Sequence, residues 1–218
     1  MADHREAMIS TAPVPSRSTF GDLPEAMRGL GARLRLPALE RHHNNRAVLG
    51  TYVLINSALS IAILSTIALI TGEPFIFPSL GPTAFLLFWA ALNAQSAPRN
   101  AFFGHLIGVL AGFAALVVFG LTAAPPNLED ITWDRVGAAT MSLCLTLSLM
   151  IWLGVPHAPA GATTLIVSLG LLRTPAQLAI LMLAVVLLIL QGLVINRLAG
   201  LPYPLWSPRP PPAEADKS

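Results

Sequence analysis

Charged side chains are scarce in this chain and unevenly placed. They make up 11% of the 218 residues, against about 25% in a typical soluble domain. Residues 1–46 hold 12 of the 24 and residues 198–218 hold 4, which leaves 8 for the 151 residues between. So few charges cannot cover a soluble surface, whereas a surface covered by lipid needs no more. The sequence therefore excludes a soluble enzyme, a nucleic-acid-binding protein and a disordered scaffold, and it predicts an all-α integral membrane protein.

Cysteine and membrane-buried acids are also scarce. The single cysteine, Cys144, lies in an apolar run, so it forms no intrachain disulfide and is expected to pack as a small hydrophobe. No aspartate or glutamate lies inside an apolar segment. Because sodium- or proton-coupled carriers often use buried carboxylates, a cation pathway is disfavoured, although backbone carbonyls could still bind a cation. The chain has no His-Glu-x-x-His and no Gly-x-Ser-x-Gly motif. We therefore predict that it is not an enzyme and that it holds no metal and no cofactor.

Six apolar segments lie between two more polar tails. The segments cover about 47–71, 75–95, 101–122, 136–153, 155–172 and 176–196. The first, third, fourth and sixth are long enough to cross roughly 30 Å of hydrocarbon as helices. The basic tail 1–46 and the proline-rich tail 198–218 are both expected to be cytoplasmic. Within the first tail, residues 20–46 could form a short helix on the membrane surface or a flexible basic stretch.

The second and fifth segments begin with prolines and small residues, PFIFPSLGPT from residue 74 and VPHAPAGATT from residue 155. Proline cannot continue a regular helix and biases the preceding residue toward an extended form. We therefore expect each segment to start extended and to become helical near Ser79 or Gly161, and the two helices to run to about Gln95 and Leu172. Each segment then either crosses the bilayer as a broken helix, the reading we favour, or re-enters as a loop.

The two broken segments belong to an internal repeat. An offset of 80 residues aligns Gly81 with Gly161 and Thr83 with Thr163. The order long helix, broken helix, long helix occurs twice, over about 47–122 and 136–197. If all six segments cross, each repeat has three crossings and the halves have inverted topology. Transporters are known with this layout, and in them the broken helices meet near the midplane of the bilayer.

The arginines and lysines predict the orientation. With six crossings and the N-terminal tail inside, 11 of them lie inside and 2 outside, and four crossings give the same count. The positive-inside rule therefore predicts that both termini lie in the cytoplasm. We expect a multi-pass protein of a bacterial-type plasma (inner) membrane. The rule does not separate six crossings from four.

Two helix breaks in matching positions predict a binding site for a small anion. Each break feeds a helix N-terminus, which carries free N–H groups and a partial positive charge. We expect those N–H groups to provide most of the binding, small residues to let the ligand approach, and hydroxyl groups to orient it. The predicted substrate-binding residues are Ser79, Gly81, Thr83, His157, Ala160, Gly161, Ala162, Thr163 and Thr164.

Further residues could couple, gate or support this site. Arg99, Asn100 and His105 are the candidates for coupling or gating. A histidine titrates near physiological pH, so His105 or His157 could carry a proton, although His105 could equally be a hydrogen-bonding group between helices. Three glycines at four-residue spacing are expected to pack against another helix, inside the protein or in a dimer: Gly104, Gly108 and Gly112.

Two motifs resemble those of a known family. The stretch SAPRN from residue 96, followed by Gly104-His105, and the stretch HAPAGAT from residue 157 resemble the HPP family of integral membrane proteins. The family is named for a His-Pro-Pro tripeptide, whose first proline is replaced here by Ala158. The resemblance covers about residues 47–197, which marks that region as an HPP-like transmembrane domain. Family members are usually described with four transmembrane helices, and plant members in chloroplasts are associated with nitrite transport.

The sequence thus predicts transport of a small monovalent anion, with nitrite or nitrate favoured. An anion channel with the same site is one alternative. A non-transporting membrane subunit that binds a protein partner is another. The expected partners are the anion, the lipid bilayer and a second copy of the chain in a homodimer, and no nucleic acid is expected.

Overall fold

The computed structural model describes residues 35–42, 44–126 and 128–208, which form helices and no strand. Four of the described helices are long and apolar enough to cross a membrane: α3 (Asn45–Thr71), α5 (Pro98–Val118), α6 (Trp133–Trp152) and α8 (Pro175–Leu198). The shorter helices are α2 (Leu36–His42), α4 (Leu80–Trp89), η1 (Ala94–Ser96) and α7 (Ala160–Ser168). The predicted all-α membrane protein is thereby confirmed. Most of the predicted surface helix in residues 20–46 lies outside the described residues, which include its end as α2.

Helix α3 shows how the bundle meets its surroundings. It begins at Asn44, whose side chain accepts hydrogen bonds from the N–H groups of Arg46 and Ala47, and it ends at Gly72 with φ of 71°. Large apolar side chains on it, such as Leu69 at 84% exposure, have no protein cover. In a protein with four such helices, this exposed apolar surface faces lipid.

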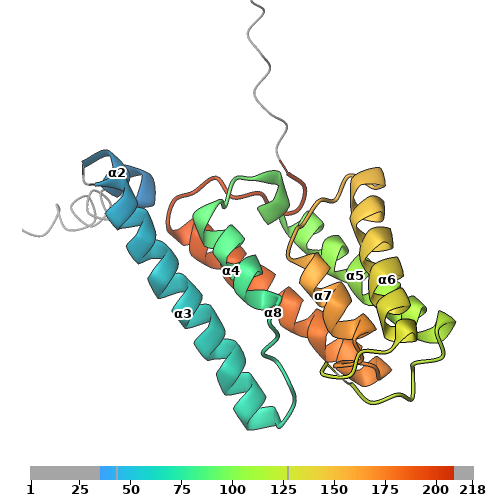
Figure 1. Cartoon of the computed structure of the whole chain (residues 1–218). Helices are drawn as coiled ribbons and strands as arrows, with labels where there is room; N and C mark the ends of the chain where they lie inside the picture. The colour runs from blue at the N-terminus through green and yellow to red at the C-terminus, as the bar shows by residue number, and fades with distance from the viewer. Residues whose placement is uncertain (1–34, 43, 127, 209–218) are drawn as a thin grey trace, which may run out of the picture.

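The bundle has two ends, which we call the α2 end and the loop end (Figure 1). At the α2 end, the N–H of Leu36 donates to the carbonyl of Ala199 at 3.0 Å. The loop end carries residues 119–126, 128–132 and 169–174. There the guanidinium of Arg135 donates to the carbonyl of Ser168 at 3.2 Å. Because these bonds join residues far apart in sequence, they fix which helix termini share a membrane face.

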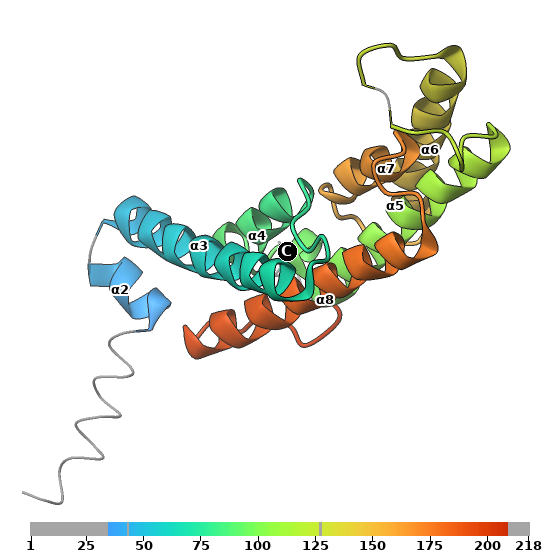
Figure 2. The ribbon, with the colours of Figure 1, turned by 90° about the horizontal axis from the view of Figure 1, so that it is seen from below.

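Helices α5 and α8 form the middle of the bundle. Helix α5 packs against α6, α7 and α8, whereas α4 packs against α3 and α8. In both views α3 and α6 lie on opposite flanks (Figures 1 and 2). The contact of α8 with α4 is made through Asn196, whose amide donates to the carbonyl of Leu87 at 2.9 Å. Each short helix therefore lies against a long helix of the other half of the chain.

The short helices begin where the prolines predict and end earlier than expected. Their N-caps are Ser79 and Pro159. Helix α4 ends at Trp89. There the Ser96 hydroxyl lies 2.9 and 2.8 Å from the carbonyls of Leu86 and Ala90. It provides a hydrogen-bond donor at the C-terminus of the helix, where carbonyls lack partners within the helix. Helix α7 ends at Ser168, before Gly170, whose φ of 81° is the left-handed C-terminal turn. At about 1.5 Å per residue they are roughly 15 and 14 Å long, half the hydrocarbon thickness.

Residues 199–208, which we call the C-terminal strap, fold back over the α2 end. Tyr203 is fully buried, and its hydroxyl donates to the carbonyl of Ser96 at 2.5 Å. The guanidinium of Arg197 donates two hydrogen bonds to the carbonyl of Tyr203. The N–H of Arg99 donates to the carbonyl of Trp206. The first part of the predicted C-terminal tail is therefore a packed element of the bundle.

Candidate functional site

Two histidines from distant parts of the chain lie side by side in the interior. His105 is on α5, and His157 lies in the extended stretch before α7. Their ring centroids are 4.9 Å apart, and both side chains are at most 1% exposed. His105 lies seven residues into α5, or roughly 10 Å from its start. We call these two side chains the histidine pair, and it lies nearer the α2 end than the loop end.

Two threonines hold the ring of His105 from opposite sides. The hydroxyl of Thr83 on α4 lies 3.0 Å from its Nε2, and the hydroxyl of Thr163 on α7 lies 2.7 Å from its Nδ1. Both threonines are fully buried. They are the residues that the 80-residue offset aligns. The first turns of the two short helices therefore converge on one imidazole.

The second histidine shares one of these threonines. Thr83 Oγ1 lies 3.3 Å from Nε2 of His157, whose Nδ1 lies 2.7 Å from the backbone carbonyl of Gln95. The side-chain carbonyl of Gln95 accepts from the N–H of Ala158 at 3.0 Å. In the sequence, Gln95 stands out only as the end of an apolar segment. Its contribution to the pair is a main-chain carbonyl, which any residue type provides, so the sequence carries no signal for it.

The hydrogen-bond partners determine which ring nitrogens carry hydrogen when both rings are neutral. A carbonyl only accepts, so Nδ1 of His157 carries the hydrogen. The single hydrogen of the Thr83 hydroxyl has two acceptors within reach, the carbonyl of Ser79 at 2.9 Å and Nε2 of His157 at 3.3 Å. In the orientation in which it points to His157, Nε2 of that ring accepts from Thr83. Nε2–H of His105 then donates to Thr83, and its Nδ1 accepts from Thr163. The result is a directed chain of four hydrogen bonds from Thr163 to Gln95. All four distances are at most 3.3 Å.

One buried hydroxyl beside this chain lacks a partner. Ser79 is fully buried, and its Oγ makes no hydrogen bond within the described part of the chain. Its backbone carbonyl lies 2.9 Å from the Thr83 hydroxyl, which places it one turn from the histidine pair. A buried hydroxyl without a partner is costly, so this donor is available to a ligand.

The helix N–H groups at the second break are less available than expected. The N–H groups of Ala160, Gly161 and Ala162 donate to the carbonyls of His157, Ala158 and Pro159 at 3.0 to 3.1 Å. The extended lead-in turns back tightly enough to pair with the first turn of α7. The backbone N–H groups at the second break are therefore already paired within the protein, and the side-chain donor without a partner beside the pair is the Ser79 hydroxyl.

Three of the predicted small residues lie off the histidine pair. Gly81 is exposed, and a Cβ built on it meets nothing within 4 Å. Gly161 and Ala162 are half-buried, and a Cβ on Gly161 meets only Leu143 at 3.5 Å. Residues one or two positions from a threonine that faces inward point to other sides of the helix. Ala160, by contrast, is fully buried.

The glycine stripe of α5 packs against α7 and its lead-in. A Cβ on Gly104 would lie 2.7 Å from Cβ of His157, and one on Gly108 would lie 2.8 Å from the carbonyl of Ala160. A Cβ on Gly112 would lie 2.8 Å from Val167. Without side chains at these three positions, α7 comes close enough for its threonine to reach His105. The stripe is thus used inside the bundle.

The remaining predicted residues surround the pair at more distance. Thr164 hydrogen-bonds to Thr146 of α6 at 2.9 Å, which ties α7 to α6. The side-chain amide of Asn100 donates to the carbonyl of Ala94, while its Oδ1 is buried without a partner in the described part of the chain. Arg99 is half-buried at the start of α5, where its N–H joins the C-terminal strap.

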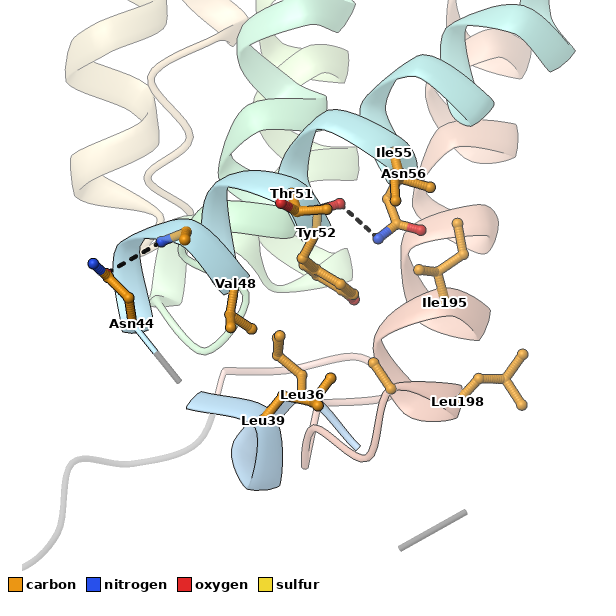
Figure 3. A pocket seen from close by; sticks show the side chains of 12 residues that line it. Leu36, Leu39, Asn44, Val48, Thr51, Tyr52, Ile55, Asn56, Ile195 and Leu198 are labelled. Carbon is orange, nitrogen blue, oxygen red and sulfur yellow. Dashed lines mark hydrogen bonds between the residues drawn. The ribbon is translucent and has the colours of Figure 1, made fainter. Parts of the chain in front are cut away.

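Two cavities of the structure lie away from the histidine pair. One of about 830 Å³ is lined by apolar side chains of α2, α3 and α8, including Leu36, Val48 and Leu198 (Figure 3). A second of about 260 Å³ lies beside Trp89. No residue of the pair or its threonines lines either cavity. Because both imidazole side chains are at most 1% exposed, the pair is closed off in this conformation. Among the described residues no three His, Cys, Asp or Glu side chains are grouped to hold a metal ion.

Comparison with known proteins gives one match. The family model described as "HPP, transmembrane region" matches residues 42–204. Neither the curated proteins nor the solved structures include a match. The matched region runs from α2 to the C-terminal strap and includes every residue of the hydrogen-bonded chain.

Proposed function

This chain belongs to the HPP transmembrane family, and from that premise we propose that it carries a small monovalent anion, nitrite or nitrate first, across the membrane. The observation that carries the proposal is the pair of threonines that hold His105. Thr83 and Thr163 occupy matching positions in the two halves, and both lie in the first turn of a helix that begins inside the bundle. Broken helices that meet in matching positions are the usual mark of a transporter's substrate site.

We propose that all six apolar segments cross the membrane and that the halves form an inverted repeat. The packing supports this proposal. Helix α7 of the second half packs on α5 of the first, and α4 of the first half packs on α8 of the second. The flanking helices correspond as well, since α3 contacts α4 and α8 while α6 contacts α7 and α5. Each short helix, with its extended lead-in at about 3.3 Å per residue, can span the remaining half of the bilayer.

The α2 end is the proposed cytoplasmic end. Arg35, Arg41, Arg46, Arg99 and Arg197 are the described basic residues there, whereas Arg135 and Arg173 lie at the loop end. The positive-inside rule places the more basic end in the cytoplasm. In a bacterial-type plasma membrane, both tails are then inside.

The proposed anion site lies at the first turn of α4, beside the histidine pair. The unpartnered hydroxyl of Ser79 supplies a free donor there, in an interior without acidic side chains. The partial positive charge at the helix start adds to it. Since hydrogen bonds within the protein close the pair, we favour a carrier that opens to one side at a time over a channel.

Uptake into sealed vesicles tests this proposal. The purified protein would be placed in liposomes, and nitrite and nitrate uptake would be compared with that of empty liposomes, because nitrous acid crosses bilayers unaided. We expect saturable uptake that is lost in Thr163→Val and kept in Thr66→Val. Thr66 is a threonine of α3 with an exposed side chain, far from the pair. Uptake equal to that of empty liposomes from a folded protein would refute anion transport and favour a partner-binding subunit.

A further inference from the structure

The proposed anion site lacks a permanent positive charge. Helices α4, η1 and α7 carry no titratable residue. On the other elements packed around the histidine pair, Cys144 is exposed, and Tyr203 lies in the C-terminal strap. The charged groups of those elements lie at helix ends: Arg99, Asp134, Arg135 and Arg197. An anion in a buried site needs a counter-charge there. Of the groups at the site, only the two imidazoles can become positive.

We infer that the histidine pair binds one proton together with each anion, so that the protein moves anion and proton across the membrane as a neutral pair. This inference rests on the proposed anion transport and adds the coupling ion. A negative-inside membrane potential opposes the uptake of an anion alone. A proton bound with it removes that opposition and also balances the buried charge.

The hydrogen bonds around Thr83 allow the proton to bind without leaving a polar group unpaired. In one orientation the Thr83 hydroxyl donates to Nε2 of His157, which lies 3.3 Å away. It can turn instead to the carbonyl of Ser79, which lies 2.9 Å away. Nε2 of His157 then has a free lone pair. The lone pair takes a proton from hydronium, which leaves as water, and a new N–H bond forms.

The resulting imidazolium keeps both of its partners. Nε2–H donates to Thr83 Oγ1, and Nδ1–H still donates to the carbonyl of Gln95 at 2.7 Å. Release of the proton to water reverses these steps. Thr83 is thus a positioning residue, because its hydroxyl direction follows the charge of His157.

The distance between the rings sets the number of protons. A second proton would place two positive rings with centroids 4.9 Å apart in the interior, where like charges strongly disfavour each other. The pair therefore holds one proton per anion. His105, which shares Thr83, can receive that proton but not a second one.

Proton movement can be measured separately from anion movement. Vesicles containing the wild-type protein would hold a pH-sensitive dye, and a nitrate gradient would be applied, since nitric acid is too strong an acid to carry protons through lipid. We expect uptake to acidify the vesicle lumen with one proton per nitrate. Potentials of either sign, set with potassium and valinomycin, are expected to leave the rate unchanged. Uptake that follows the potential without acidification would overturn the coupling and leave anion transport standing. No protein-dependent uptake of nitrate or nitrite would overturn both.

Matched variants test the role of Thr83. Thr83→Val removes the turning hydroxyl, whereas Thr83→Ser keeps it. Thr66→Val is the control, because the Thr66 hydroxyl also donates to the carbonyl four residues earlier but is exposed on α3. We expect coupled acidification to be lost in Thr83→Val and kept in the other two. His157→Gln provides a second test if Thr83→Val does not fold. Wild-type acidification in the folded His157→Gln protein would rule out the pair as the proton carrier.

Discussion

Thr83 and Thr163 lie 80 positions apart in the chain and bind the two nitrogens of one ring, that of His105. Each is in the first turn of a helix that starts inside the bundle. The two helices belong to different halves of the chain, so neither half can form this site alone. The repeat contains one such histidine rather than two, because the offset of 80 residues aligns His105 with Val185, an apolar residue. We therefore expect one site.

The Ser79 hydroxyl is expected to lower the stability of the fold and to contribute to anion binding. Its buried hydroxyl has no partner in the described part of the chain and makes no cap bond to α4. An unpaired buried hydroxyl costs about 1–3 kcal/mol, so Ser79→Ala should unfold at the same or a higher temperature. The KM for the anion should rise, because a donor to the ligand is lost.

The control for Ser79 is Ser60 on α3, whose hydroxyl is also buried without a partner among the described residues. Ser60→Ala should show the same change of unfolding temperature with an unchanged KM. Equal KM values for the two variants would place Ser79 outside the anion site.

A methyl group at Gly108 should destabilise the bundle. It would lie 2.8 Å from both the carbonyl of Ala160 and the hydroxyl of Thr164. Overpacking of this kind costs about 1–3 kcal/mol, so Gly108→Ala should unfold at a lower temperature in detergent. Gly50→Ala is the control, since Gly50 is exposed in α3 with nothing within 4 Å, and alanine there should stabilise the helix by about 0.5–1 kcal/mol. Similar melting of both variants would contradict the close packing of α5 on α7.

Transport should depend on Gly104 far more than on Gly161. A Cβ on Gly104 would displace His157, whose own Cβ would be 2.7 Å away, whereas one on Gly161 makes an ordinary contact with Leu143. Initial uptake rates of Gly104→Ala and Gly161→Ala, normalised to folded protein, compare the two. We expect Gly104→Ala to lose uptake and Gly161→Ala to keep it. The reverse order would mean that the ligand approaches the backbone at Gly161.

The strap should make the protein sensitive to alkali through Tyr203. Burial raises the pKa of the Tyr203 hydroxyl above its usual value of about 10. Above that pH the tyrosine ionises in the unfolded chain but stays neutral in the folded one, so stability falls as the pH rises. Tyr203→Phe should lose the bond to Ser96, about 1 kcal/mol, and should lose this part of the alkaline decline. Unfolding temperatures measured from about pH 8 to about pH 11 would show it. Parallel curves for both proteins would mean that Tyr203 is not buried against Ser96.

Some of this site could be predicted from the sequence because the signals are local. The prolines before Ser79 and Ala160 restrict the backbone in any context, and the starts of α4 and α7 follow from them. The end of α4 depends on Ser96, which hydrogen-bonds to α4 from another element, and no local pattern reports that contact. Helix α7 ends before Gly170, a glycine that the expected boundary at Leu172 passed over. The predicted helices were therefore too long.

Of the residues that meet at the site, the sequence predicted those whose role depends on the side chain and missed those whose role depends on the folded backbone. The repeat singled out Thr83 and Thr163 because their chemistry depends on residue type. Gly161 was grouped with them although it faces Leu143, because an extended lead-in gives no helical register by which to assign faces. Gln95 contributes a backbone carbonyl, which only the folded structure reveals.

Counterflow of isotope-labelled nitrate tests the central claim most directly. Vesicles with the reconstituted protein would be loaded with unlabelled nitrate and diluted into a trace of the labelled ion. For a carrier with this site, we expect a transient accumulation of label in wild-type vesicles. The accumulation should be absent in Thr83→Val and Thr163→Val and present in Thr66→Val. Equilibration of the label without accumulation would indicate a channel. Label uptake no greater than in empty vesicles, from protein that is folded, would contradict an anion site held by the two threonines.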